Sequence, residues 1–388
     1  MNKKKIAILG STGSIGKTLI NLIKKDKKNF EIVLLSAEGN YKELLKQAKL
    51  FKVKNLIITG EESFLKIKKD RYTKKINVYN TFDKFNKIFK SKVDYTMSSI
   101  TGIQGLKPTV EIIKYTRTIA IANKEAIICG WSLISKELKR NKTRFIPVDS
   151  EHFSLWFGTN KINIKKIENF YLTASGGPFH NWPLNKFHKI KISQALKHPN
   201  WKMGKKISID SATMINKVYE VIEAKNIFSI PYKKISILIH PKSYLHAIVK
   251  FNNGMIKIIA HDTTMKIPIF NTLYLDSDKK LFSKKLDINI LNNLYLKKVS
   301  KKRYPMMNIL NTLPLKSSLY ETVIVSANDT LVDLFLKKKI NFLDIHKKLF
   351  KLIKSKEFFK YKKIYPKNIK DIINLNDYVR LKIKKKSV

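Results

Sequence analysis

Residues 5–16 read KIAILGSTGSIG, a short apolar run that leads into a turn with three glycines. An amphipathic segment, residues 17–25, follows directly, so the pattern predicts a strand, a tight turn and a helix. Glycines in such a turn let the backbone approach a pyrophosphate, and the N-terminus of the following helix stabilises its charge. The segment therefore predicts a dinucleotide-binding turn, although a tight turn without a ligand has the same signature.

Strand and helix patterns alternate from here to Val148. The apolar run 31–35 precedes a helical pattern at 41–51, and further strand patterns lie at 55–59, 93–99, 118–122 and 143–148. Alternation of this kind is typical of βαβ units. We therefore expect an α/β fold whose residues 1–149 form a Rossmann-like, doubly wound parallel sheet that binds the coenzyme.

The sequence changes character after Val148. Polar loops and an antiparallel strand pattern at 235–251 predict a central α+β catalytic domain over residues 150–285. Within it, residues 198–206 are typical of a mobile lid that excludes water, or of a plain surface loop. Residues 286–304 are expected to be a linker, and residues 305–388 a small helical domain with lysine-rich polar faces.

The charge balance is strongly basic. Lys and Arg number 78 against 29 Asp and Glu, a formal net charge of +49, which raises nucleic-acid binding as a hypothesis. The lysines are spread along the whole chain, without a nucleic-acid recognition motif. We therefore expect no specific nucleic-acid partner, while anionic substrates should be attracted by the net field.

Cysteine content and hydropathy indicate the compartment. Cys129 is the single cysteine, so no disulfide forms within the chain, which fits a reducing cytosol. The apolar run 6–9 is too short for a signal peptide, and no later run approaches the length of a membrane span. We expect a cytoplasmic protein without a membrane segment.

Acidic residues follow the strand pattern at 143–148. Asp149 and Glu151 would point to the same side of an extended segment, and a third carboxylate would complete an oxygen site for Mg²⁺ or Mn²⁺. The alternative is a helix capped by Asp149 or Ser150. Glu220 is the candidate for the third acid, with Glu223 as its competitor.

Residues 211–220 read as one capped helix. In it Asn216, Lys217 and Glu220 share a face, because they are spaced three and four residues apart. Donors suited to a phosphate pocket are Ser175, His198, Ser211 and Lys217, although each alone is also an ordinary turn or helix residue.

The segment after the second strand pattern bears on the choice of coenzyme. An acid here favours NADH and a base accommodates the 2′-phosphate of NADPH. The sequence offers Glu38, before Gly39 and Asn40, and also Lys42. This pattern alone therefore does not decide between NADH and NADPH.

Taken together, these motifs resemble the 1-deoxy-D-xylulose 5-phosphate reductoisomerase family. The resemblance is carried by GSTGSIG from residue 10, ANKE at 122–125, PVDSEH at 147–152, SGGPF at 175–179, HPNWKMGKKISIDSAT at 198–213, NK at 216–217, HPKS at 240–243 and RYP at 303–305. The chain departs from the family pattern at AEGN (37–40), at NKVYE in place of NKGLE, at HDTTMKIP in place of GxPDMRxP, and at VSAND in place of NAANE.

The resemblance implies an activity. It is the rearrangement and NADPH-dependent reduction of 1-deoxy-D-xylulose 5-phosphate to 2-C-methyl-D-erythritol 4-phosphate in non-mevalonate isoprenoid synthesis. A homodimer with Mn²⁺, Mg²⁺ or Co²⁺ is implied as well. A dehydrogenase of another sugar phosphate is the nearest rival.

The resemblance also implies roles for individual residues. Coenzyme binding is implied for Gly10, Ser11, Thr12, Gly13, Ser14, Ile15, Gly39, Asn40, Asn123, Glu125 and Gly204. Metal binding is implied for Asp149, Glu151 and Glu220. Substrate binding is implied for Lys124, Ser150, Glu151, Ser175, His198, Trp201, Ser211, Asn216, Lys217 and Glu220, with Lys124 and Glu151 catalytic.

Overall fold

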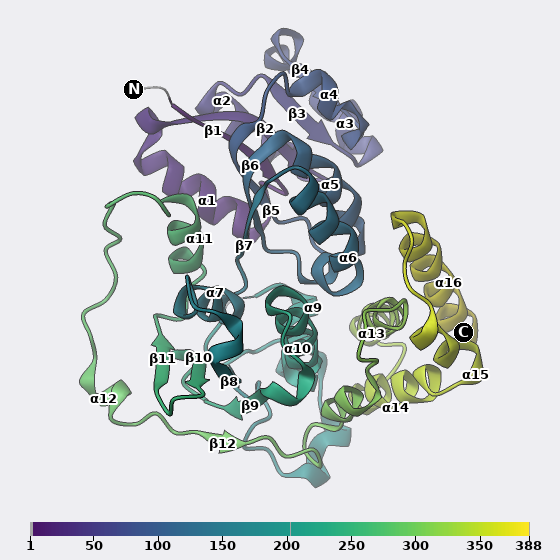
Figure 1. Ribbon diagram of the computed structural model, residues 1–388. Helices are drawn as coiled ribbons and strands as arrows, with labels where there is room; N and C mark the ends of the chain where they lie inside the picture. Colours follow the sequence, from purple (N-terminus) through teal and green to yellow (C-terminus); the bar gives the residue numbers. More distant parts are fainter. Residues whose placement is uncertain (1–2, 202, 388) are drawn as a thin grey trace. The chain divides into compact units, whose positions relative to one another are not determined.

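The computed structural model describes residues 3–201 and 203–387 and separates into two compact units (Figure 1). The first unit comprises Met1–Ala126, Ser132–Asp149 and Met265–Phe282. The second comprises Ile127–Trp131, Ser150–Thr264 and Ser283–Val388. The expected domain division at residues 149, 285 and 304 stays a prediction.

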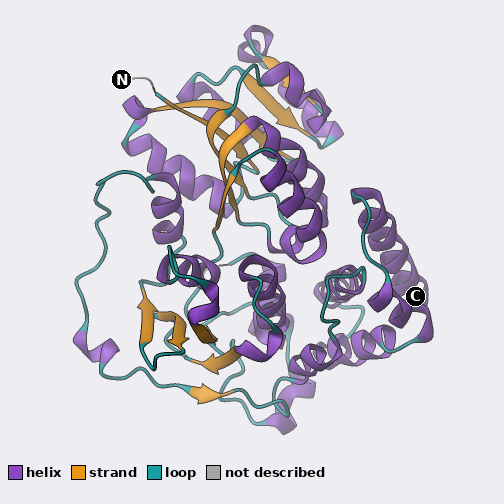
Figure 2. Ribbon diagram, viewed as in Figure 1, coloured by secondary structure: helices purple, strands orange, loops and turns teal. Residues whose placement is uncertain are grey.

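The first unit is built on a seven-stranded sheet in which every neighbouring pair is parallel (Figure 2). Its strands are β1 (Lys4–Leu9), β2 (Phe30–Ala37), β3 (Asn55–Ile58), β4 (Asn77–Tyr79), β5 (Val93–Ser98), β6 (Thr116–Ile121) and β7 (Arg144–Pro147). The order β4-β3-β2-β1-β5-β6-β7 reverses direction at β1, which creates the switch point where such sheets bind ligands. The doubly wound sheet is confirmed.

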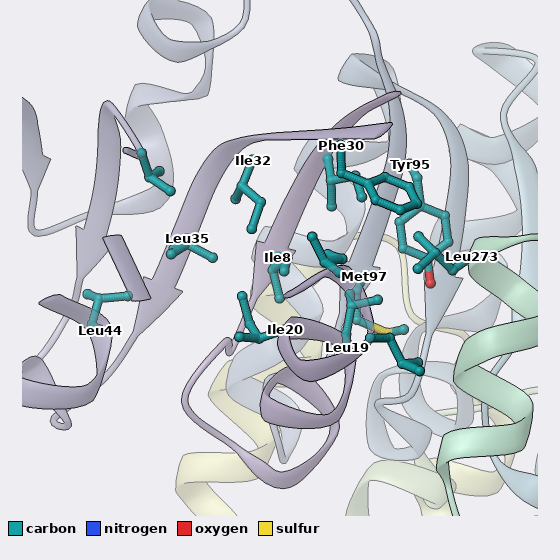
Figure 3. Packing of buried hydrophobic residues seen from close by; sticks show 14 of the residues in the cluster. Ile8, Leu19, Ile20, Phe30, Ile32, Leu35, Leu44, Tyr95, Met97 and Leu273 are labelled. Atoms are coloured by element: carbon teal, nitrogen blue, oxygen red, sulfur yellow. The ribbon is translucent and has the colours of Figure 1, made fainter. Parts of the chain in front are cut away.

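Helices cover this sheet and complete its core. They are α1 (Ser14–Lys25), α2 (Tyr41–Phe51), α3 (Glu61–Lys68), α4 (Phe85–Ile88), α5 (Leu106–Ile112), α6 (Lys124–Arg140) and α11 (Lys266–Leu273). Figure 3 shows Ile8 of β1 and Leu19 of α1 within the cluster that also holds Leu273 of α11. The hydroxyl groups of Tyr95 and Thr272 lie 2.9 Å apart. The sequence patterns did not predict that α11 belongs to this core.

The second unit holds a five-stranded sheet of order β11-β10-β8-β9-β12. Its strands are β8 (Ile167–Ala174), β9 (Ile235–Ile239), β10 (Leu245–Phe251), β11 (Ile256–Ala260) and β12 (Lys297–Lys298). β9 runs parallel to β8 and β10 runs antiparallel to it. The segment 235–251 therefore has the expected antiparallel directions, but β8 separates its two strands. β10 pairs instead with β11 as a hairpin around residues 252–255.

Helices make up the rest of the second unit. They are α7 (Ser150–Gly158), α8 (Ile192–Ala195), α9 (Lys205–Thr213), α10 (Ile215–Phe228), α12 (Ile288–Leu291), α13 (Tyr320–Leu336), α14 (Phe342–Ile353), α15 (Lys356–Phe359) and α16 (Ile369–Ser387). Val221 and Ala224 of α10 pack with Phe170 of β8 in the core of this unit. Towards the C-terminus, α13 packs against α14 and α16. No helix among the described residues is both long and apolar enough to cross a bilayer.

One buried acid makes the stability of the second unit depend on pH. Glu321 lies in the first turn of α13 and is 1% exposed. Its Oε2 accepts hydrogen bonds from the backbone amide of Ser318 (3.0 Å) and from the Ser318 hydroxyl (2.6 Å). Burial raises the pKa of Glu321 from 4.5 to about 7. The folded state thus keeps a proton that the unfolded chain loses, so stability falls as the pH rises from 4.5 through 7.

Replacing Glu321 with Gln should remove this pH dependence. The amide keeps an acceptor for both Ser318 donors but does not ionise, so Glu321→Gln should exceed the parent in stability by about 3 kcal/mol at pH 8. At pH 4, below the pKa of the unfolded chain, the two proteins should agree closely. Denaturant unfolding at both pH values measures this, with Glu168→Gln, an exposed partner of Lys250, as the control. A less stable Glu321→Gln protein at pH 8 would contradict the prediction.

Candidate active site

The glycine turn after β1 has the geometry of an anion-binding loop. Gly10 has φ +80°, and a Cβ there would lie 2.9 Å from the carbonyl oxygen of Ser99. A Cβ at Gly16 would lie 2.4 Å from the carbonyl oxygen of Gly10. Gly13 precedes α1 and supplies no side-chain cap, so the first amides of this helix can bind an anion. Within the described residues, the buried Ser11 hydroxyl has no hydrogen-bond partner. These features fit a dinucleotide phosphate.

The loop after β2 carries the residues that bear on coenzyme choice. Glu38, Gly39, Asn40 and Lys42 are all exposed. Asn40 caps α2, because its side chain accepts a hydrogen bond from the amide of Glu43 at 3.2 Å. The structure thus places one acid and one base beside the end of β2, where the adenosine ribose of a dinucleotide lies in folds of this kind.

Asn123 is a structural residue of the first unit. Its Oδ1 accepts from the amide of Ala126 at 2.9 Å and caps α6, while its Nδ2 donates to the carbonyl of Gly102 at 2.9 Å. A Cβ at Gly105 would lie 2.2 Å from that nitrogen. Asn123 therefore fixes the loop after β5, and its part in coenzyme binding stays a prediction.

The start of α6 brings Lys124 to the end of the parallel sheet. Lys124 and Glu125 are the first two residues of this helix, and both are buried. Lys124 Nζ lies 2.6 Å from Oδ2 of Asp149, and the two side chains are only 11% and 12% exposed. A shielded pair of this kind is a stronger interaction than a surface salt bridge.

Glu151 lies in a helix and not on an extended segment, so the expected i, i+2 geometry was wrong. Apolar side chains such as Phe153 and Leu155 are buried on α7, and this packing favours a helix from Ser150 onward. A helix does begin at Ser150, as the alternative required, while the capping role of Asp149 or Ser150 stays a prediction. The Ser150 hydroxyl donates to Oε2 of Glu151 at 2.6 Å. The positive end of α7 stabilises this carboxylate.

The segment predicted as one helix from Ser211 is two helices. Met214 has φ +66° and separates α9, which contains Ser211, from α10. The interpretation of a single capped helix was therefore wrong. A left-handed residue ends the first helix and redirects the second.

The shared face on α10 is confirmed. The side chain of Asn216 donates to Oε1 of Glu220, and Lys217 Nζ contacts Oε2 of the same carboxylate. Lys217 also lies 3.2 Å from Oε1 of Glu151 on α7. One lysine thus bridges two carboxylates that come from different helices, and both Lys217 and Glu220 are nearly inaccessible to water.

Glu151 and Glu220 form a group suited to a cation within the second unit, because both carboxylates contact Lys217 Nζ. Asp149, the residue directly before α7, offers a third carboxylate. Three carboxylates are the hard oxygen ligands that Mg²⁺ and Mn²⁺ prefer. The donor set therefore fits a divalent metal.

Glu223, the competing third acid, faces a buried histidine. Its Oε2 lies 3.4 Å from Nδ1 of His152. The side chains of His152 and Glu223 are 0% and 1% exposed. The Nε2 of His152 lies 2.8 Å from the backbone carbonyl of Glu220. Glu223 therefore pairs with a nitrogen donor, whereas Asp149, Glu151 and Glu220 supply the oxygen donors that Mg²⁺ prefers.

A second cluster of polar groups follows β8. The Ser175 hydroxyl lies 3.0 Å from Nε2 of His198 and accepts from the amide of Gly177 at 3.0 Å. Nδ1 of His198 accepts from the amides of Asn200 (3.1 Å) and Trp201 (3.0 Å). The imidazole proton therefore sits on Nε2 and points to Ser175. Burial, helped by nearby Lys217, lowers the pKa of His198 to about 4, so the ring is a neutral donor at pH 7.

Residues of the predicted lid contact β10 and the loop that precedes it in the second unit. The side chain of Asn200 donates to Oγ of Ser243 at 2.8 Å, and the ring of Trp201 meets His246 edge-on at 6.2 Å. Gly204 precedes α9, and a Cβ there would touch nothing within 4 Å. Lys202, within the predicted lid, lies outside the described residues.

Asn328 and Asp329 of α13 hold α9 in place, although the sequence patterns did not single them out as functional. Asn328 of α13 donates to Oδ1 of Asp210 at 2.7 Å. Lys206 Nζ lies 3.0 Å from Asp210 and 3.0 Å from Asp329. Asn328 and Asp329 belong to the segment VSAND. A polar pair inside the apolar helix 320–336 was the available signal.

Comparisons with known proteins match the same family along most of the chain. Sequence profiles of 1-deoxy-D-xylulose 5-phosphate reductoisomerase match residues 6–130, and profiles of its C-terminal domains match residues 145–228 and 262–382. The reductoisomerase of Pelagibacter ubique is 59% identical over 387 residues, which cover 99% of this chain and 100% of that protein. The reductoisomerase of Sulfurihydrogenibium sp. is 37% identical, with 93% and 92% covered.

Solved structures agree as well. The Zymomonas mobilis reductoisomerase in complex with NADPH is 29% identical, covers 98% of each chain and has a TM-score of 0.86. A DOX-P reductoisomerase in complex with NADPH, fosmidomycin and magnesium shares the fold, with a TM-score of 0.87, 24% identity, and 99% and 98% covered. The chain therefore belongs to the 1-deoxy-D-xylulose 5-phosphate reductoisomerase family.

Proposed function

We propose that this chain converts 1-deoxy-D-xylulose 5-phosphate to 2-C-methyl-D-erythritol 4-phosphate, with NADPH as reductant and Mn²⁺, Mg²⁺ or Co²⁺ as the required cation. The observation that carries the proposal is the buried Lys217, which binds Glu151 and Glu220 from different helices. Such a cluster places cationic and anionic groups where an oxygen-rich substrate and a metal can bind together. Family membership supplies the reaction.

Each bound group would supply a distinct part of the chemistry. Asp149, Glu151 and Glu220 would hold the metal, which would supply Lewis-acid polarisation of the substrate carbonyl, and the bound nicotinamide would supply the hydride. Lys124, whose ammonium lies beside Asp149, can move a proton to or from a substrate oxygen. Ser150, which donates to Glu151, orients that carboxylate.

The substrate phosphate is assigned to the cluster that follows β8. Ser175, His198 and Ser211 are expected to bind it with Asn216 and Lys217. A neutral His198 offers its Nε2 proton as a donor, and Lys217 offers charge. Trp201, anchored near His246, is expected to cover the bound substrate and exclude water.

The coenzyme is assigned to the turn after β1. Ser11, Gly13 and the start of α1 would bind the pyrophosphate, and the match to a relative solved with NADPH supports that choice. Lys42 can accommodate a 2′-phosphate beside Asn40. We also propose that the enzyme works in the cytoplasm, which suits its single buried thiol.

The reaction should require both the metal and the phosphorylated substrate. Purified protein should oxidise NADPH faster than NADH when given deoxyxylulose phosphate and Mn²⁺, and a chelator should abolish turnover until Mn²⁺ is restored. A dehydrogenase of another sugar phosphate need not require metal, because plain hydride transfer can proceed without one. Turnover that survives the chelator, or that prefers a different sugar phosphate, would favour this rival.

Removing one charge from the metal group should stop the reaction while leaving the fold intact. Asp149→Asn loses a ligand and the partner of Lys124, so kcat should fall by roughly 100-fold or more. The matched control is Asp276→Asn, which alters an exposed carboxylate 3.3 Å from Arg144. Circular dichroism and NADPH oxidation together measure fold and turnover. Activity like that of the parent in Asp149→Asn would contradict the metal assignment.

We further propose that the enzyme is a homodimer. β11 is an edge strand of the second sheet, and it and the residue before it expose Met255 (64%), Ile256 (55%) and Ile258 (55%). An apolar edge of this kind is what a second copy covers in a two-fold dimer. Light scattering should give twice the 45.1 kDa of one chain, and Ile258→Lys should shift the mass towards one copy. A monomer at micromolar concentration would refute this.

A further inference from the structure

The loop that carries Ser175 is set by contacts that the proposed reaction leaves unexplained. Gly176 has φ +83° and Gly177 has φ +68°, so two successive residues adopt the left-handed region. A Cβ on Gly177 would lie 2.9 Å from the carbonyl oxygen of Ser211 on α9. The loop is therefore pressed against the helix that carries the second serine of the proposed phosphate site.

The other side of this loop is held by Tyr304. The Tyr304 hydroxyl donates to the carbonyl of Gly176 at 2.8 Å, and a Cβ on Gly176 would lie 3.0 Å from that hydroxyl. The side chain is 2% exposed, and burial raises the pKa of Tyr304 to about 12. The phenol therefore remains a proton donor throughout the pH range in which the enzyme can work.

Arg303 holds the downstream part of the same loop. One guanidinium nitrogen donates to the carbonyl of Phe179 at 2.9 Å and to that of Trp182 at 2.7 Å. The guanidinium also lies over the ring of Phe187 at 5.7 Å. Arg303 and Tyr304 thus satisfy three backbone carbonyls of residues 176–182 from one dipeptide at the end of the segment expected to be a linker.

The consequence reaches Ser175 through the backbone. The Ser175 hydroxyl accepts from the amide of Gly177 and lies beside Nε2 of His198, so its direction depends on where residues 176–177 are held. If the carbonyl of Gly176 were released, this peptide could rotate, because glycine has no preferred φ sign. A shift of this kind would misplace the donors that meet a phosphate.

We propose that Tyr304 and Arg303 are positioning residues that clamp residues 175–182 in the conformation that binds the substrate phosphate. This inference rests on the proposed phosphate site at Ser175. Neither side chain needs to touch the substrate. Their effect should therefore appear in the affinity for phosphate-bearing ligands and not in the hydride step.

The test compares two matched tyrosine variants. Tyr304→Phe removes only the hydroxyl that binds Gly176, and it should raise the KM for deoxyxylulose phosphate roughly fivefold, with kcat and the KM for NADPH within about twofold of the parent. The inhibition constant of inorganic phosphate should rise by the same factor. Tyr320→Phe is the control, since Tyr320 is fully buried and its hydroxyl lies 3.3 Å from the carbonyl of Ile353 in the same unit.

If Tyr304 had only a structural role, Tyr304→Phe and Tyr320→Phe would both lower the melting temperature. The KM for deoxyxylulose phosphate would then change in neither variant, or by the same factor in both. Either of these results overturns the clamp. Arg303→Lys, which keeps a donor for the two carbonyls, should raise the KM less than Arg303→Gln, and equal effects would also count against it.

Ser175→Ala separates the clamp from the site on which it rests. This variant should raise the KM for the sugar phosphate by about tenfold. If Ser175→Ala raises the KM and Tyr304→Phe does not, the clamp alone is wrong. If Ser175→Ala leaves the KM unchanged, the proposed phosphate site is wrong and the clamp falls with it.

Discussion

The site depends on keeping two carboxylates, Glu151 and Glu220, close together in a region that water scarcely reaches. Like charges in such a place repel and lose hydration, so they persist only beside a cation. Lys217 of α10 is that cation, because it contacts both carboxylates. The dipole of α7 also stabilises Glu151, which lies in the first turn of this helix. The left-handed Met214 is what allows α10 to start where it does. The position of α10 is therefore an electrostatic requirement as much as a packing one.

The sequence predicted the structure correctly where a short-range pattern determines the local conformation. The apolar runs and the glycine turn predicted the parallel sheet, and the helix over residues 41–51 lies where its pattern placed it. The three- and four-residue spacing also predicted the shared face of Asn216, Lys217 and Glu220. Local patterns succeed here because each depends on neighbours that are close in the chain.

Prediction failed where distant contacts decide. Glu151 was expected on an extended segment, but burial of Phe153 and Leu155 favours a helix from Ser150. The boundary between α9 and α10 could not be predicted from a glycine, since the left-handed residue at this boundary is Met214. Arg303 and Tyr304 stand out in the sequence only as part of the short motif RYP at 303–305. Their contacts with the loop at 176–182 span more than 120 positions, which no periodicity reveals.

The return of residues 265–282 to the first unit has a consequence for how the chain can be divided. Ile269, Phe270 and Leu273 fill part of the core beneath the parallel sheet, although more than a hundred residues of the other unit come between. A fragment that stops at residue 149 would expose the apolar side chains that these residues cover, and it should aggregate or lose stability. The nucleotide-binding half is thus an assembly of separated segments. It should fold autonomously only if the 265–282 peptide is fused or added back to it.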